Sequence, residues 1–190
     1  MNLPNKLTIS RIFLTFIFMY FLFVRWPGAK YFALITFIIA CWTDYYDGYV
    51  ARRENKITDF GRLMDPVADK ILVLAAFLAF VELKLIPAWT VVIIVAREVT
   101  VTGLRLFSLG RGRVLEAQEA GKHKTVSQMA AIFTILIFLI FKDTAKFLSF
   151  WNSTIEKWFL NTIFALMLIT VALTITSGIS YLWRNRRMLT

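Results

Sequence analysis

The chain has 190 residues, 58% of them hydrophobic, and a mean hydropathy of +0.65. The apolar share of a soluble domain is nearer one half, so this composition excludes an ordinary soluble protein. The formal net charge is +10, but the basic residues fall in short loops between hydrophobic stretches, which indicates a membrane protein rather than a nucleic-acid-binding one.

Six apolar stretches follow one another along the chain, and each is long enough, at about 1.5 Å per residue, to cross a hydrocarbon core of about 30 Å. They predict helices at residues 7–24, 31–51, 66–83, 86–109, 125–141 and 158–183. Pro27-Gly28 and Pro87 fall where helices should begin or end, and Pro66 suits the first turn of the third span. The sequence therefore predicts one all-α integral membrane domain, residues 1–190, with six transmembrane helices.

Lys and Arg are divided unevenly between alternate loops. Twelve lie in the N-terminal segment, residues 52–64, residues 110–124 and the C-terminal tail, against six in the opposite loops. The positive-inside rule then places both termini and the 52–64 loop in the cytoplasm. Arg11 interrupts the first apolar run and no small-residue cleavage site follows it, so we expect this span to be retained rather than removed as a signal peptide.

Four aspartates stand out in the second and third spans. Asp44 and Asp47 are three residues apart, and Asp65 and Asp69 are four apart, so each pair occupies one helix face. A short loop joins the two spans, and their cytoplasmic ends can bring all four acids together. Carboxylates converging near hydrocarbon repel one another unless cations neutralise them, and oxygen ligands favour Mg²⁺, Mn²⁺ or Ca²⁺. Two such ions could bridge a pyrophosphate.

Two other interpretations of these acids remain open. They could cap helices or pair with nearby basic side chains in a solvated rim. Gly48 and Gly61 argue against that, because they leave room for a nucleotide to approach the backbone. A divalent-cation transporter would also carry carboxylates in its spans, although its acids would be expected to run across the membrane instead of clustering at one depth.

The order of these residues resembles the complete signature of the CDP-alcohol phosphotransferase family. The matching residues are Asp44 followed by Asp47-Gly48-x2-Ala51-Arg52-x8-Gly61-x3-Asp65-x3-Asp69. The resemblance implies a six-helix membrane enzyme, usually a homodimer, with two divalent ions in a site that opens toward the cytoplasm. It implies that Asp44, Asp47 and Asp65 are the principal metal ligands and that Asp69 is the general base, which can also contact the second ion. Gly48, Arg52 and Gly61 would hold the CDP group.

Further motifs resemble the bacterial members of the family whose acceptor is glycerol 3-phosphate. These motifs are Leu3-Pro4-Asn5-x2-Thr8-x2-Arg11, Asp65-Pro66-Val67-Ala68-Asp69-Lys70, Ala96-Arg97-Glu98 and Gly121-Lys122-x-Lys124-Thr125-x2-Gln128. They imply transfer of the phosphatidyl group of CDP-diacylglycerol to glycerol 3-phosphate, with release of CMP, at a bacterial inner membrane. Asn5 and Thr8 are then expected at the CDP site. A sibling enzyme that uses inositol phosphate or serine stays open.

Basic residues inside the fourth span suggest how an anionic acceptor is held. Arg97, Glu98 and Arg105 lie in apolar surroundings, where ionisable groups usually have a function. A phosphate dianion is bound well by Arg and Lys. We expect the acceptor phosphate to be bound by Lys70, Arg97, Arg105, Lys122, Lys124 and Thr125. The alternatives are an ion pair of Glu98 with Arg97 or with another helix, and lysines that hold anionic lipid headgroups.

Overall fold

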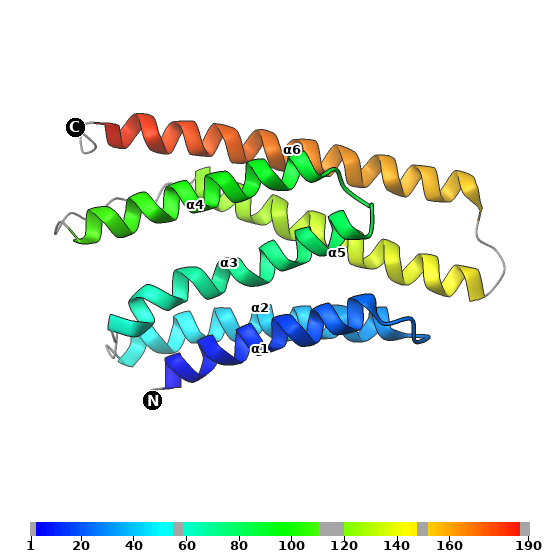
Figure 1. The fold of residues 1–190 in the computed structure, drawn as a ribbon, viewed down its shortest axis with the longest axis horizontal. Helices are drawn as coiled ribbons and strands as arrows, with labels where there is room; N and C mark the ends of the chain where they lie inside the picture. The colour runs from blue at the N-terminus through cyan, green and yellow to red at the C-terminus, as the bar shows by residue number, and fades with distance from the viewer. Residues whose placement is uncertain (1–2, 55–58, 111–119, 148–151, 187–190) are drawn as a thin grey trace. The chain divides into compact units, whose positions relative to one another are not determined.

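The computed structural model describes the backbone of residues 3–54, 59–110, 120–147 and 152–186 (Figure 1) and the side chains of residues 9–43, 70–108, 122–145 and 152–186. Within these ranges the chain forms six α-helices. They are α1 (Leu3–Phe23), α2 (Ala29–Glu54), α3 (Asp59–Glu82), α4 (Ala88–Gly110), α5 (Ala120–Phe147) and α6 (Ser153–Asn185). Each predicted span coincides with one helix, so the all-helical class is confirmed. Most helices extend beyond their apolar runs, because backbone hydrogen bonding continues into polar sequence at their ends.

The third helix begins earlier than predicted. We expected Pro66 in its first turn, but α3 starts at Asp59, so Pro66 lies in the helix interior. The prediction was wrong because the apolar run starts at Pro66, whereas the helical backbone already passes through the polar residues before it. Proline has no N–H to donate to the carbonyl of Arg62, so one hydrogen bond of the helix is missing there. Asp65 consequently lies within α3 and not ahead of it.

The chain divides into two compact units. The first contains residues 1–79 and 136–152, and so α1, α2, most of α3 and the end of α5. In this unit α1 and α2 pack against each other as antiparallel neighbours. Phe18 and Phe37 are fully buried between them, with ring centroids 5.5 Å apart. Gly28, at φ +85°, turns the chain between the helices, and Lys30 Nζ donates to the carbonyl of Leu22 at 2.6 Å, capping the end of α1.

The second unit contains residues 80–135 and 153–190, and so α4, α6 and the first part of α5. In it α4 and α6 lie side by side and run in the same direction (Figure 1). Their register is fixed by two contacts. Arg97 bonds to Ser177, and one turn further on Val101 and Tyr181 share a buried cluster. This pairing brings together residues 80 positions apart in the sequence.

The turn after α3 also lies in this second unit. The N–H of Leu85 donates to the carbonyl of Phe80 at 3.0 Å, and the N–H of Lys84 donates to the carbonyl of Val81 at 2.9 Å. These are the two hydrogen bonds of a Schellman motif, and Lys84 takes the left-handed position at φ 57°. A glycine is usual at this position, so the residue that takes the left-handed conformation carries no signal of its own, although the helix ends within one residue of the predicted 83.

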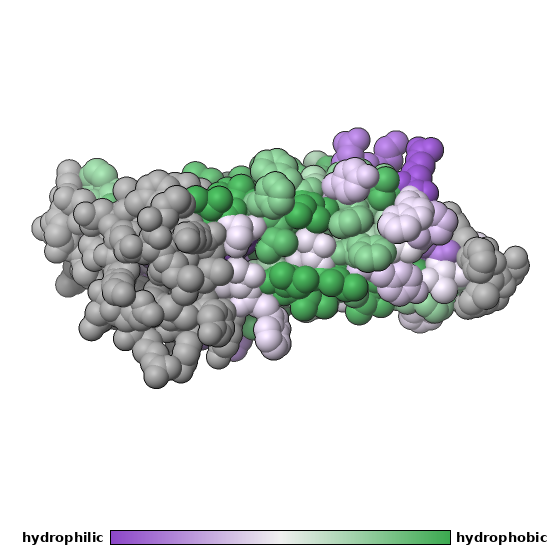
Figure 2. Space-filling view, turned by 90° about the horizontal axis from the view of Figure 1, so that it is seen from below, coloured by the Kyte–Doolittle hydropathy of each residue, from purple (hydrophilic) through white to green (hydrophobic). Residues whose placement is uncertain are grey.

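The described surface exposes many large apolar side chains. Trp42, Trp158 and Trp183 are 78%, 72% and 70% exposed. Figure 2 shows hydrophobic residues over the middle of one face and hydrophilic ones gathered near an end. Of the described helices, two segments, Lys122–Ala145 and Ser153–Asn185, are long and apolar enough to cross a membrane, and two shorter apolar helices lie at Ile9–Phe23 and Ala29–Thr43. This surface is consistent with a membrane protein, because water-facing proteins rarely expose such large apolar areas.

Candidate active site

The four predicted metal ligands lie near the ends of α2 and α3 that residues 55–58 connect. Asp44 and Asp47 are in the last turns of α2, and Asp65 and Asp69 are in the first turns of α3. At about 1.5 Å per residue, Asp47 is about 10 Å from the end of α2 and Asp65 about 9 Å from the start of α3. Both pairs therefore lie at similar distances from the connection. Their side chains are outside the described residues, so their convergence on metal stays a prediction.

The start of α1 belongs to the same end of the first unit. Phe18 packs on Phe37 in the antiparallel pair of α1 and α2. Continuing that register along both helices places Thr8 level with Asp47, because every residue rises equally along each axis. Thr8 and its neighbour Asn5 are therefore at the depth where the CDP group was predicted.

The other predicted CDP-binding residues are also in helical backbone near this end. Gly48 and Arg52 lie in α2, and Gly61 lies in α3. The side chains of all five predicted CDP-binding residues, Asn5 and Thr8 included, lie outside the described residues. Their contacts with a nucleotide therefore remain a prediction.

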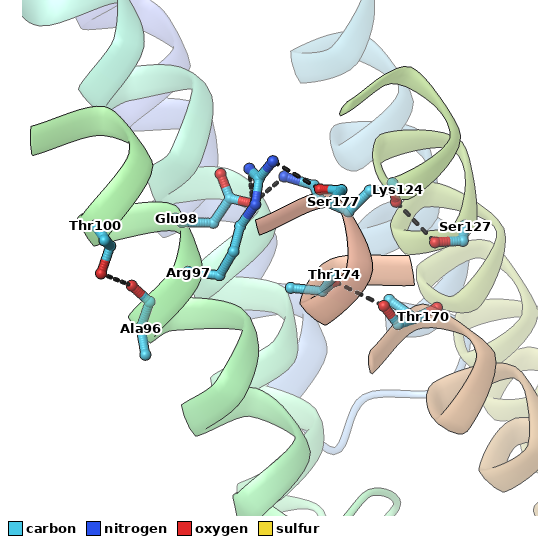
Figure 3. Close-up of polar contacts among 9 residues, drawn as sticks. All are labelled: Ala96, Arg97, Glu98, Thr100, Lys124, Ser127, Thr170, Thr174 and Ser177. Atoms are coloured by element: carbon cyan, nitrogen blue, oxygen red, sulfur yellow. Dashed lines mark hydrogen bonds and ion pairs between the residues drawn. The ribbon is translucent and has the colours of Figure 1, made fainter. Parts of the chain in front are cut away.

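An ionic cluster in the second unit joins three helices (Figure 3). Glu98 of α4 accepts a hydrogen bond from Lys124 Nζ of α5, and both side chains are almost fully buried, at 5% and 2% exposure. Arg97 Nη1 lies 3.3 Å from the same carboxylate oxygen, and Arg97 Nη2 donates to Ser177 Oγ of α6 at 2.8 Å. Among the described side chains, two cations thus share this one carboxylate.

The guanidinium of Arg97 has N–H donors that these contacts do not use. Its contacts with Glu98 and Ser177 use two of the five N–H groups that an arginine carries. Its Nε is buried and has no hydrogen-bond partner among the described residues. Leaving such a donor unsatisfied costs about 1–3 kcal/mol, so an acceptor brought to Arg97 would be bound favourably.

The predicted acceptor-phosphate residues are only partly brought together. Arg97 and Lys124 meet at Glu98, as the ion-pair interpretation expected. Arg105 lies exposed two turns further along α4, and Lys122 and Thr125 are exposed near the start of α5. Lys70 is half-buried in α3, which belongs to the first unit.

Sequence reasoning missed the residues of α6 beside this cluster. Ser177 and Gly178 contact Arg97 directly. Tyr181 of α6, and Gln128 of α5, which the sequence analysis named only as part of a motif, are buried, and their hydroxyl and Nε2 lack hydrogen-bond partners within the described ranges. For Ser177 and Gly178 the available signal was a pair of small residues inside an apolar span, a pattern typical of close helix contacts in membranes.

A cavity of about 740 Å³ lies elsewhere in the first unit. Trp26, Lys30, Tyr31 and Asp143 are among the residues that line it, beside the turn between α1 and α2. Tyr31 and Asp44 are separated along α2 by about 20 Å of helix. The cavity therefore does not coincide with the predicted metal site.

The described side chains define a class of protein. Its helices expose apolar side chains, while Arg97, Glu98 and Lys124 form a buried ionic cluster between apolar helices. Ionisable groups in that setting are expensive and usually serve function. These are features consistent with an all-helical membrane protein that carries a cluster of ionisable side chains among its helices.

Comparison with known proteins identifies the family. The model of the CDP-alcohol phosphatidyltransferase family matches residues 1–176, and the chain belongs to that family. It is 39% identical over 177 residues to the CDP-diacylglycerol–glycerol-3-phosphate 3-phosphatidyltransferase of Bacillus subtilis, covering 83% of this chain and 92% of the relative. The enzyme of the same name from Wigglesworthia glossinidia brevipalpis is 33% identical, over 72% of this chain and 77% of the relative. A probable phosphatidylglycerophosphate synthase of Mycobacterium tuberculosis is 40% identical, over 69% and 64%.

Proposed function

We propose that this chain transfers the phosphatidyl group of CDP-diacylglycerol to glycerol 3-phosphate, forming phosphatidylglycerol phosphate and CMP in phospholipid synthesis. The observation that carries the proposal is the complete aspartate signature, placed at matching depths of α2 and α3 in a member of this family. The names of the relatives from Bacillus subtilis and Wigglesworthia glossinidia brevipalpis support the acceptor.

The aspartates fit a pair of hard divalent cations. Four carboxylates at one end of two connected helices supply oxygen ligands only, which suits Mg²⁺ or Mn²⁺. Asp44, Asp47, Asp65 and, in part, Asp69 would hold the ions. When bound, such ions would neutralise the pyrophosphate of the donor lipid.

The protein's own residues then carry out alignment and proton transfer. Asp69 accepts the proton of the acceptor hydroxyl, whose oxygen forms a bond to the lipid-side phosphorus. The bond from that phosphorus to the oxygen of CMP breaks, and CMP leaves with the electron pair. Gly48 and Gly61 let the nucleotide approach the backbone, and Arg52 pairs with its phosphates.

Arg97 and Lys124 supply the charge that selects a phosphorylated acceptor. Arg97 keeps N–H donors that its contacts with Glu98 and Ser177 do not use, and within the described side chains Arg97 and Lys124 are two cations on one carboxylate. A phosphate dianion accepts hydrogen bonds from these donors and also complements their charge, whereas an uncharged alcohol could only accept a hydrogen bond. Arg105, Lys122 and Thr125 of the same unit, and Lys70 of the first unit, stay sequence-based candidates for binding the phosphate.

The enzyme is proposed to lie in the bacterial inner membrane as a homodimer. The Lys and Arg excess in alternate loops favours both termini and the aspartate end of the helices in the cytoplasm, where glycerol 3-phosphate and CMP are soluble.

Transfer by the purified protein in detergent tests the proposal. CDP-diacylglycerol, Mg²⁺ or Mn²⁺ and labelled glycerol 3-phosphate are supplied, and both CMP release and label in the lipid phase are measured, with inositol phosphate and serine in parallel. Metal-dependent transfer to glycerol 3-phosphate, lost in Asp65→Asn, is expected. Transfer to inositol phosphate or serine instead would keep the reaction and refute the acceptor. No transfer to any of them, with cation flux in proteoliposomes, would favour a transporter.

A further inference from the structure

Two small residues of α6 stand directly against the arginine of α4. Ser177 Oγ accepts a hydrogen bond from Arg97 Nη2 at 2.8 Å, and the Arg97 side chain passes over the backbone of Gly178. Both small residues are buried. They lie just beyond residue 176, where the match to the family model ends.

The hydrogen bonds hold the guanidinium at two points. Glu98 contacts Nη1 at 3.3 Å and Ser177 contacts Nη2 at 2.8 Å. A planar group held at two of its nitrogens has its plane and its free edge fixed. Nε is buried and has no hydrogen-bond partner in the described part of the chain, and the Arg97 side chain as a whole keeps 14% of its surface exposed.

Gly178 determines how closely the arginine stem approaches α6. A Cβ added at this glycine would lie 3.1 Å from Arg97 Cγ. That is tighter than nine in ten real Cβ contacts, so a side chain at position 178 would require the Arg97 stem to shift by a few tenths of an ångström. Glycine at this position therefore lets the arginine stem pack closely against α6, and the reason is packing and not backbone conformation.

We infer that Ser177 and Gly178 are positioning residues for the acceptor site: they hold the Arg97 guanidinium so that its free N–H donors meet the phosphate of the acceptor. The inference rests on the proposed function, because it assumes that Arg97 binds that phosphate. It adds that α6, which carries none of the predicted site residues, sets the affinity for the acceptor. A mispositioned arginine weakens a bidentate phosphate contact even when its charge is retained.

Steady-state kinetics on the full-length protein in detergent tests this. Ser177→Ala removes the hydroxyl, and Gly178→Ala adds a Cβ 3.1 Å from Arg97 Cγ, so that the arginine stem has to shift. Each is expected to raise the KM for glycerol 3-phosphate about five- to tenfold. The KM for CDP-diacylglycerol and kcat are expected to stay within about twofold, because neither residue touches the donor or the reacting atoms.

Matched controls separate positioning from general packing. Gly103→Ala makes the same change in α4, where an added Cβ meets nothing within 4 Å. Thr176→Ala removes an exposed hydroxyl that bonds to carbonyls of its own helix, at 2.9 Å to Ala172. Both controls are expected to keep the wild-type KM for glycerol 3-phosphate.

Arg97→Gln tests the role of Arg97 separately from the positioning role of Ser177 and Gly178. If this variant leaves the KM for glycerol 3-phosphate unchanged, the proposed role of Arg97 is lost, and with it the inference. If Arg97→Gln raises that KM while Ser177→Ala and Gly178→Ala behave like the controls, the inference alone is refuted. Equal rises in both KM values with a lower Tm would mean a structural role and would also refute it. The double variant Arg97→Gln/Ser177→Ala is expected to be no worse than Arg97→Gln alone.

Discussion

Removing the charge of Glu98 should destabilise the second unit strongly. Glu98→Gln keeps the size of the side chain but leaves Lys124 and Arg97 without their shared anion. The Lys124 and Glu98 side chains are only 2% and 5% exposed, so solvent screens them little. Breaking a buried ion pair by removing one partner typically costs about 3–5 kcal/mol. For a chain of this length, 3 kcal/mol corresponds to a fall in Tm of roughly 6–12 °C.

Thermal unfolding in detergent, followed by tryptophan fluorescence, measures this effect, since the chain has six tryptophans. Glu82→Gln is the matched control, because Glu82 is exposed at the end of α3 and its substitution should leave Tm nearly unchanged. Inorganic phosphate should raise the Tm of Glu98→Gln more than that of the wild type, because an anion can take the place of the carboxylate. A Tm for Glu98→Gln within about 2 °C of the control would refute the buried cluster as a stabilising element.

Three further outcomes are expected. Asp69→Asn should lower kcat about 10²- to 10⁴-fold with little change in the KM for CDP-diacylglycerol, because the variant lacks the general base. Near-normal turnover by a folded, metal-binding variant would exclude that role. Chelation with EDTA should abolish CMP release and added Mg²⁺ or Mn²⁺ should restore it, whereas activity that survives chelation would contradict the metal site. Phe18→Ala should lower the free energy of unfolding by about 3 kcal/mol, seen as a lower Tm, because Phe18 is fully buried against Phe37. Phe13→Ala is the control and should change Tm far less, because Phe13 is 66% exposed.

The positions of the helices could be predicted because the apolar stretches are long and are separated by proline, glycine and charged residues. The ends were less certain. Pro66 was placed in a first turn because it opens an apolar run, yet α3 begins at Asp59. At the other end of α3, Lys84 occupies a left-handed position that normally signals itself by glycine. The early start has a physical cause: backbone hydrogen bonding extends a helix past the residues whose hydropathy reveals it.

The sequence by itself determined the class of the protein, its six helices and the four aspartates whose spacing of three and four gives one helix face each. These features are local, because they depend on composition and on the helical period. Only the tertiary structure decided which polar side chains meet. It brought Arg97, Lys124 and Ser177 together from three helices, and it left Arg105 and Lys122 exposed. Helical periodicity says which residues share a face but not which faces pack together, so the fit of Arg97 over Gly178 emerges only when α4 and α6 are paired.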